Sequence, residues 1–387
     1  MGIPEKGEEP LSVIRSLVER RTKDPNYIKG EVLGSMITQP SEIAIEAYKI
    51  FIDTNLNDPL LFPETAKLEY EVIRMVSTLL KNPKPLGLIT YGGSESNITA
   101  MYTLREMRRG SVIIAPMSIH FSIHKAAKIL GLRVIEVGLD EGYRADISEI
   151  ETQVRRYRDN VVAIALTAGT TELGVVDPIA EVGKIAEDFG IPIHVDAAYG
   201  GFIIPFLKMA GYKLPDFDFS IQGVETITLD PHKCGLAPIP SSLLLFRSEA
   251  IFSKIYFTAS YMPTGRQKGL LGTRCGGVAA ATWAILRATG IEGYIELSKK
   301  MLKNAKLLAK LASESGFELV IEPILPIVCI KLPKPKRKIF QYLWSRKLYA
   351  YPSSMFNAIR VVVMPHIREA HIHKFIDELK KAVEKVK

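Results

Sequence analysis

The chain has 387 residues, 47% of them apolar, so it is long enough to bury one large core and a smaller second one. It contains no apolar run as long as a membrane span, and its charged N-terminus lacks a signal-peptide core, which favours a soluble, cytoplasmic protein without a membrane partner. Its three cysteines are far apart, which argues against a disulfide framework or a zinc cluster.

The net charge of +8 makes nucleic-acid binding one hypothesis. Basic and acidic residues are interspersed everywhere except in residues 331–338, a short run between an apolar strand and a helix that is typical of a solvated loop. An anionic cofactor, an acidic substrate or simple solubility also explains mild basicity. We therefore predict no nucleic-acid partner.

Apolar spacing predicts helices over residues 10–21, 42–52 and 64–80, with Ser41 as a candidate cap of the second. The stretch Thr90-Tyr-Gly-Gly-Ser-Glu-Ser-Asn97 then opens a helix that continues to about residue 108. Gly92 and Gly93 let the backbone approach an anion, and Ser94 is a candidate cap. The first free amides of such a helix suit a phosphate group, although capping alone also explains the pattern.

From residue 111 onward, short apolar strands alternate with helices. Strands are expected at 112–115, 134–137, 161–166, 191–195 and 226–229, and helices at 120–130, 147–156 and 179–189. This alternation predicts an α/β fold with a large, mostly parallel sheet that helices cover on both faces. Ligands of such sheets bind at the carboxyl ends of the strands, which here carry His120, Thr171, Asp196 and Lys233.

Lys233 and Asp196 form the most informative pair. A buried lysine at a strand end tends to lose its proton, and the free amine is then a nucleophile for the aldehyde of pyridoxal phosphate. A carboxylate at Asp196 is suited to keeping the ring nitrogen of that cofactor protonated, so that the ring acts as an electron sink. Taken singly, the lysine also fits an exposed position, and the aspartate also fits a helix cap or a metal ligand. Together they favour pyridoxal phosphate, and we predict no metal site.

The regular alternation of strands and helices ends in the C-terminal part. After a strand at 241–246 and a loop at 257–268, a long helix from about residue 293 precedes strands at 317–321, 327–332 and 359–364 and helices at 338–346 and from 368. These elements predict a small α/β domain. The expected organisation is an N-terminal helical segment (1–50), a large cofactor-binding domain (51–290) and a small C-terminal domain (291–387).

Three motifs resemble those of the group II pyridoxal-phosphate-dependent decarboxylases: His194-Val-Asp-Ala-Ala-Tyr-Gly-Gly201, Asp216-Phe-Asp-Phe219 and Asp230-Pro-His-Lys233. Similarity to the archaeal L-tyrosine/L-aspartate decarboxylases extends through residues 168–174, 237–240, 271–274 and 360–366. The resemblance runs from about residue 34 to the C-terminus. It implies the fold-type I pyridoxal-phosphate-dependent transferase fold, decarboxylation of an amino acid, and a homodimer with shared active sites.

The resemblance also implies roles for particular residues. Lys233 binds the cofactor covalently, Asp196 contacts its ring nitrogen and His120 stacks on its ring. On the sequence alone, a histidine at a helix start such as His120 also fits a cap or a satisfied core residue. Further predicted cofactor contacts are Gly93, Ser94, Thr171, Ala198, Thr226 and Thr273.

For catalysis, Tyr261 matches a tyrosine on a mobile loop that reaches across the dimer, and it is the expected proton donor to Cα, with Lys233 and the neighbouring His232 as alternatives. Arg360 is expected to orient a substrate carboxylate, and residues 34–40 resemble a segment that lines the site.

The substrate stays open at this point. L-aspartate, giving β-alanine for coenzyme A synthesis, L-tyrosine, giving tyramine, and L-glutamate all remain candidates. A carbon–carbon lyase similar to sphingosine-phosphate lyase is the alternative within the same fold.

Overall fold

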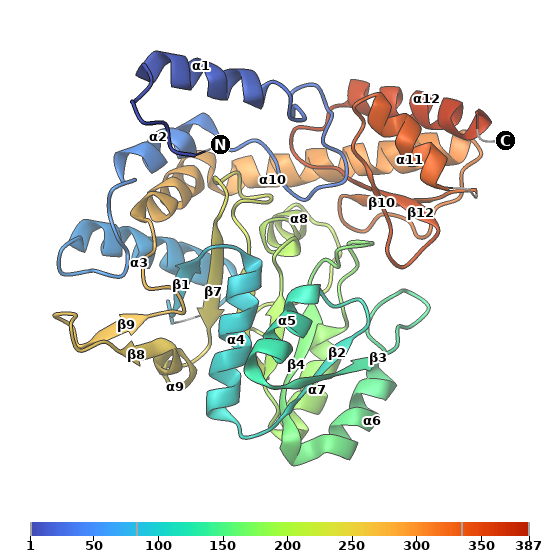
Figure 1. The fold of residues 1–387 in the computed structure, drawn as a ribbon. Coiled ribbons are helices and arrows are strands. Elements are labelled where there is room, and N and C mark those ends of the chain that lie inside the picture. The colour runs from blue at the N-terminus through green and yellow to red at the C-terminus, as the bar shows by residue number, and fades with distance from the viewer. Residues whose placement is uncertain (1, 83, 334–335, 386–387) are drawn as a thin grey trace.

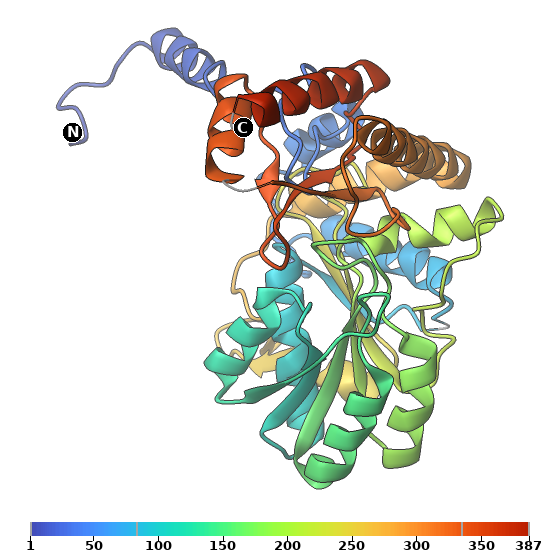
Figure 2. The ribbon, with the colours of Figure 1, turned by 90° about the vertical axis from the view of Figure 1, so that its right-hand side faces the viewer.

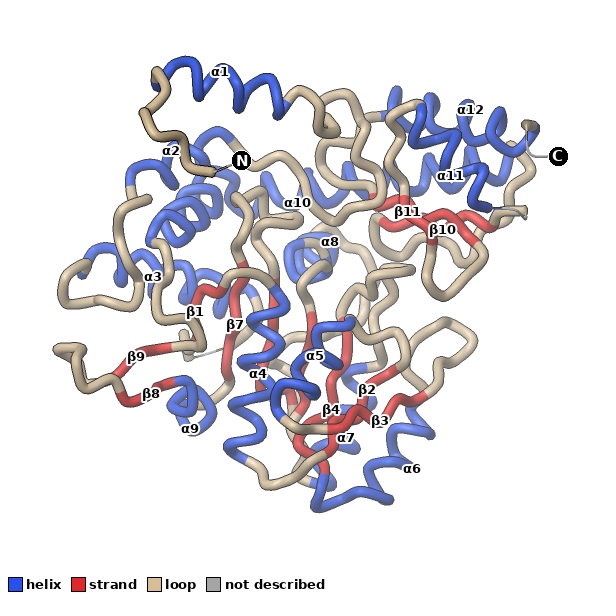
Figure 3. The backbone as a smooth tube through the Cα atoms, viewed as in Figure 1, coloured by secondary structure: helices blue, strands red, loops and turns tan. Residues whose placement is uncertain are grey.

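A computed structural model of the chain describes residues 2–82, 84–333 and 336–385. Its centre is a seven-stranded sheet with the order β1-β7-β6-β5-β4-β2-β3 (Figures 1 and 3). β7 runs antiparallel to its neighbours β1 and β6, and the other pairs are parallel. The strands are β1 (Gly87–Thr90), β2 (Val112–Pro116), β3 (Arg133–Val137), β4 (Val161–Thr167), β5 (Ile193–Asp196), β6 (Val224–Leu229) and β7 (Ser242–Phe246). The predicted mostly parallel sheet is confirmed, and β1 is an addition to it.

Both faces of the sheet are buried. Consecutive strand residues such as Ile113 and Ile114 are both inaccessible to solvent and belong to core clusters on opposite faces. This explains why the strands are continuously apolar rather than alternating. One face packs against α3 (Pro63–Leu79), α6 (Ile147–Tyr157), α7 (Ile179–Phe189), α8 (Ile204–Met209) and α10 (Gly276–Glu314), and the other against α4 (Gly93–Met107), α5 (Phe121–Leu130) and α9 (Glu249–Phe252).

The C-terminal part forms a second, smaller core. Its three-stranded antiparallel sheet has the order β10-β12-β11, and its core also contains Leu33 from the N-terminal segment. α10 runs through both parts and is kinked at Gly290, whose φ of +61° is outside helical geometry. The elements are β10 (Ile327–Lys331), α11 (Lys336–Ser345), β11 (Tyr351–Pro352), β12 (Ala358–Val362) and α12 (Glu369–Glu384).

The N-terminal helices differ in how they pack. α2 (Glu42–Ile50) lies against α10, whereas α1 (Pro10–Arg21) has no buried residue and extends from the body of the molecule (Figure 2). The side chains of α1 that are apolar and exposed are Leu11, Val13, Ile14, Leu17 and Val18. Among the described residues, none of the helices combines the length and apolarity needed to cross a bilayer.

Three local predictions are wrong. The expected loop at 257–268 contains a β-hairpin of β8 (Tyr256–Thr258) and β9 (Arg266–Lys268). The expected strand at 317–321 makes only a single bridge, from Leu319 to Ile330 on the free edge of β10. Ser94 does not cap α4, since the cap position is Gly92 and Ser94 lies inside the first turn.

Candidate active site

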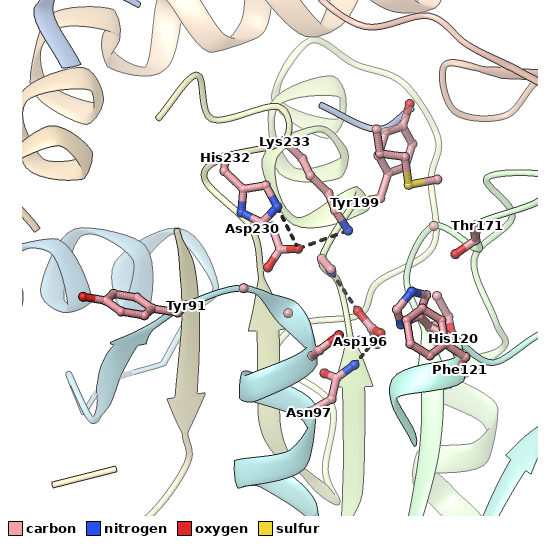
Figure 4. A pocket seen from close by; sticks show the side chains of 17 residues that line it. Tyr91, Asn97, His120, Phe121, Thr171, Asp196, Tyr199, Asp230, His232 and Lys233 are labelled. Carbon is pink, nitrogen blue, oxygen red and sulfur yellow. Dashed lines mark hydrogen bonds and ion pairs between the residues drawn. The ribbon is translucent and has the colours of Figure 1, made fainter. Parts of the chain in front are cut away.

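A cavity of about 320 Å³ lies at the carboxyl ends of β4, β5 and β6 (Figure 4). Adjacent parallel strands end at the same edge of the sheet, so residues far apart in sequence meet there. Most of the predicted site residues line this cavity: Gly93, Ser94, His120, Thr171, Asp196, Ala198, His232 and Lys233.

Lys233 is bound to a carboxylate. Its side chain is 18% exposed, and Nζ lies 3.1 Å from Oδ2 of the buried Asp230. Burial acts to lower the pKa of Lys233, but the charges of Asp230 and Asp196 outweigh it, so the pKa is raised above its usual value. The prediction of a lysine that loses its proton through burial is therefore wrong for this structure, because that argument left out the neighbouring carboxylates.

Asp196 is held by two donors. The backbone N–H of Ala198 donates to Oδ1 over 3.0 Å, and the side-chain amide of Asn97 donates to Oδ2 over 2.7 Å (Figure 4). A carboxylate oxygen accepts more than one hydrogen bond. Asp196 can therefore accept a further donor from the cavity without losing either contact.

His120 stands at the N-terminal cap of α5, where its Nδ1 lies 2.8 Å from the hydroxyl oxygen of Ser122. Burial lowers the pKa of His120. The imidazole is thus neutral at pH 7, which suits a flat ring that stacks on another ring rather than one that pairs with an anion.

Glycine is present at Gly92, the cap of α4, and at Gly93, its first residue, for different structural reasons. Gly92 has φ of +106°, a conformation that favours glycine, and it precedes the free amides at the start of the helix. At Gly93 a Cβ atom would lie 2.9 Å from Oδ2 of Asp230, so glycine is required there for close packing. The resulting helix start faces the cavity and is suited to a phosphate.

The remaining predicted residues lie outside the cavity lining. Thr226 is buried behind it, with its hydroxyl 2.9 Å from Nδ1 of His194. Arg360 donates to the carbonyl oxygens of Thr171 (2.6 Å) and Gly34 (3.1 Å), so it links the N-terminal segment to the loop after β4. Thr273 is exposed, and Tyr261 is 81% exposed between β8 and β9.

Sequence reasoning missed several residues of the site. Asp230 and Asn97 stand inside the motifs already singled out, and Phe121 lines the cavity beside them. Met36 also lines the cavity and belongs to the segment 34–40 that was expected to do so. A sequence signal existed for Asn97, because its spacing of four from Gly93 places both on the same face of α4. By contrast, the Asp216-Phe-Asp-Phe219 motif is structural, since its two aspartates pair with Lys81 and Lys208.

Comparison with known proteins identifies the family. The pyridoxal-dependent decarboxylase conserved domain matches residues 45–333. The chain belongs to this decarboxylase family.

Curated relatives cover nearly the whole decarboxylase. The L-aspartate/L-glutamate decarboxylase of Pyrococcus horikoshii is 39% identical over 391 residues, covering 99% of this chain and 100% of the relative. A probable L-tyrosine/L-aspartate decarboxylase of Methanocella arvoryzae is also 39% identical (98% and 100%), and the L-aspartate decarboxylase of Thermococcus kodakarensis is 37% identical (99% and 100%).

Solved structures have the same fold. A sphingosine-1-phosphate lyase of Burkholderia pseudomallei superposes with a TM-score of 0.91 at 26% identity, covering 99% of this chain and 92% of that one. A glutamate decarboxylase of Lactobacillus brevis superposes with a TM-score of 0.88 at 21% identity, covering 100% and 94%. The fold-type I assignment is confirmed, and the decarboxylase is a carboxy-lyase that acts on an amino acid with pyridoxal phosphate as cofactor.

The side chains of the decarboxylase fit this cofactor. The cavity combines an amine (Lys233), a carboxylate with remaining acceptor capacity (Asp196) and a helix start suited to phosphate. Two buried oxygens of lining residues, Oγ1 of Thr167 and Oδ1 of Asp230, have no hydrogen-bond partner within the described residues. When bound, pyridoxal phosphate supplies the electron sink that allows the bond between Cα and the carboxylate to break.

Proposed function

We propose that this decarboxylase converts L-aspartate into β-alanine and carbon dioxide. The observation that carries the proposal is that L-aspartate is the substrate common to the names of the three relatives above, each matched over nearly its full length. The size of the cavity supports it. About 320 Å³ is at the small end of the range of ligand sites, about 300–1,000 Å³, and this space must hold both the cofactor and the substrate.

In this proposal Lys233 holds the cofactor, Asp196 contacts the ring nitrogen and His120 covers the ring. Gly93 and Ser94 bind the phosphate, with Thr171 and Ala198 beside the ring. The position of these residues around one cavity supports the assignment.

We further propose a homodimer with shared sites. Tyr261 does not line the cavity of its own chain and is 81% exposed, which supports a contribution to the site of a second copy. Thr273 is exposed in the segment after β9 and is suited to contacting the phosphate in the site of the second copy. The exposed apolar side chains of α1 also favour burial against another subunit. We place the protein in the cytoplasm, with β-alanine supplied to coenzyme A synthesis.

The proton that replaces the lost carboxylate on Cα comes, in this proposal, from Tyr261 of the partner subunit. His232 and Lys233 are the alternative donors from the same chain. His232 is held beside the cavity, because its Nδ1 donates to the carbonyl of Ser241 and its Nε2 lies 3.8 Å from Oδ2 of Asp230.

The substrate is tested by assaying carbon dioxide release from L-aspartate, L-tyrosine and L-glutamate with the purified, cofactor-loaded protein. We expect kcat/KM to be highest for L-aspartate, with β-alanine as the product. A higher kcat/KM for L-tyrosine or L-glutamate contradicts the proposal. Cleavage of a carbon–carbon bond without carbon dioxide release favours the lyase alternative.

A further inference from the structure

A buried hydrogen-bond network extends from Asp196 and Asn97, which line the cavity, into the protein interior. It connects β6, β5, α4 and α5 through Thr226, His194, Asn97 and Ser122, all of which are buried. Asn97 is its centre, because it contacts three of the other side chains: Asp196 (2.7 Å), Ser122 (2.8 Å) and His194 (3.0 Å).

The chemistry of the groups fixes the direction of the hydrogen bonds. Both N–H bonds of the Asn97 amide are used, one toward Asp196 and one toward Ser122. The amide oxygen accepts only, so Nε2 of His194, 3.0 Å away, must be the donor to it. The opposite orientation of the amide would put its oxygen against the carboxylate of Asp196, where two acceptors would repel each other.

The tautomer of His194 follows. Burial lowers the pKa of His194 to about 4, so the ring has a single proton at pH 7. That proton is on Nε2, and Nδ1 therefore accepts from the hydroxyl of Thr226 over 2.9 Å. Thr226 and His194 together hold the Asn97 oxygen in place and leave its two N–H bonds directed at Asp196 and Ser122.

A second branch leads to His120. Because Ser122 accepts from Asn97, its own proton is free to go to Nδ1 of His120, 2.8 Å away. The backbone N–H of Ser122 also points at this Nδ1, over 3.4 Å. Nδ1 of His120 is thus an acceptor, and the single proton of the neutral ring lies on Nε2.

We propose that Asn97 is a positioning residue for the cofactor ring: one amide, oriented by His194, aims the Asp196 carboxylate and selects the tautomer of His120. The inference rests on the proposed contacts of Asp196 and His120 with pyridoxal phosphate. It goes beyond these two contacts, because it makes the orientation of both side chains depend on one buried amide. That amide does not have to carry a charge or exchange a proton.

The first test uses the unmodified protein. Nitrogen-15 NMR of histidine-labelled protein without cofactor, with resonances assigned through His120→Gln and His194→Gln, reports which ring nitrogen carries the proton. We expect protonated Nε2 and unprotonated Nδ1 in both rings at pH 7.5. A protonated Nδ1 in either ring overturns the proposal, and this result does not depend on whether a variant of Asn97 folds.

The second test measures the dissociation constant of pyridoxal phosphate by absorbance titration of Asn97→Leu, which keeps the volume and removes both donors. We expect the constant to rise about 10- to 100-fold, as for the loss of a hydrogen bond to a charged group. Ser96→Ala is the matched control. Ser96 is the preceding residue of α4, is equally buried, and loses hydrogen bonds to Thr90 (2.6 Å) and Ser242 (2.9 Å) without contacting Asp196.

Ser96→Ala is expected to bind the cofactor within about twofold of the unmodified protein. Equal affinities of Asn97→Leu and Ser96→Ala overturn the proposal, because Asn97 would then act only in stability. Neither test uses an amino-acid substrate. If L-aspartate is not the substrate, the substrate assay will show this, and the results of these two tests will not be affected.

Discussion

At the scale of single residues, the site depends on how charges are paired. Lys233 begins as a cation because Asp230 lies 3.1 Å away, and burial alone would have predicted the opposite. Asp196 is instead surrounded by neutral donors, Asn97 and the amide of Ala198. The two carboxylates therefore have different partners. Asp230 pairs with a cation, whereas Asp196 has no positively charged group within hydrogen-bond distance among the described residues.

Lys233→Ala is expected to abolish turnover, because no other lysine lines the cavity within the described residues. The variant should still bind pyridoxal phosphate, without a covalent link. The measurement is borohydride reduction of the unmodified protein followed by peptide mapping, which should find the pyridoxyl group on Lys233. A pyridoxyl group on a different lysine would show that Lys233 is not the residue that binds the cofactor covalently.

Asp196→Asn is expected to keep the fold and lower kcat by on the order of 10³-fold, because a neutral amide cannot keep the ring nitrogen protonated. Asp218→Asn serves as the control, since Asp218 is also buried but pairs with Lys81 away from the cavity. Its kcat should stay near that of the unmodified enzyme. If the kcat of Asp196→Asn also stayed near that of the unmodified enzyme, the proposed contact of Asp196 with the ring nitrogen would be contradicted.

At the scale of elements, one buried ion cluster fixes the segment that follows the β8–β9 hairpin. Glu69 on α3 accepts from Lys268 at the end of β9 and from Arg274, whose side chain is fully buried. Arg274 also donates to the carbonyl of Ile89 and to Asn57. The hairpin and residues 271–274 are thus attached to the large sheet at their base, while Tyr261 and Thr273 stay exposed.

Glu69→Gln should destabilise the protein by about 3 kcal/mol or more, because it leaves Arg274 buried without its counter-charge. Glu64→Gln on the same helix is the control. Its partner Lys67 is 3.7 Å away and both side chains are exposed, so the loss should be below about 1 kcal/mol. Thermal unfolding of the two variants measures the difference, and equal melting temperatures would contradict the role of the cluster.

The same cluster predicts a dependence of stability on pH. Burial opposes ionisation of Glu69, but Arg274 and Lys268 outweigh it and lower the pKa of Glu69 to about 2. A lowered folded-state pKa means that the stabilisation is present above the unfolded value, near 4.5, and is lost as pH falls toward 2. The difference in melting temperature between the unmodified protein and Glu69→Gln should therefore shrink as the pH is lowered below 4.5. A constant difference would point to a loss of packing instead.

In the whole molecule, the apolar side chains of α1 and the side chain of Tyr261 are exposed to solvent and are not covered by the rest of the described chain. A helix that buries none of its own residues gains little stability from its fold alone. The proposed homodimer would account for both features, because a second copy could cover them, and a closed dimer is the commonest symmetric assembly.

Mixing Tyr261→Phe subunits with Lys233→Ala subunits tests this arrangement. If each site takes the two residues from different chains, a mixed dimer contains one intact site, and amine formation should rise above that of either variant alone. By itself, Tyr261→Phe should still release carbon dioxide but form less amine and more aldehyde. Without a proton delivered to Cα by Tyr261, the substrate nitrogen would leave with the cofactor as pyridoxamine phosphate, and water would supply the aldehyde oxygen. An unchanged ratio of amine to aldehyde in Tyr261→Phe would exclude Tyr261 as the donor.

The pattern of apolar strands and helices was enough to predict the sheet and its strand ends, and to single out candidate site residues there. Continuous apolar strands separated by helices have few solutions other than a parallel sheet covered on both faces, and such a sheet places its ligands at the strand ends. Asp196 and Lys233 could therefore be placed at one edge without coordinates. The resemblance to the family added His120, Gly93 and Ser94 as expected cofactor contacts.

How these residues are charged and supported depends on contacts between elements that are distant in the sequence. The raised pKa of Lys233 depends on Asp230 being 3.1 Å away, and the role of Thr226 depends on His194, which lies on a different strand. The sequence places Asn97 on the right face of a helix but contains nothing about its three partners. Electrostatic and hydrogen-bond energies depend on distances between side chains, and those distances exist only once the strands and helices are packed.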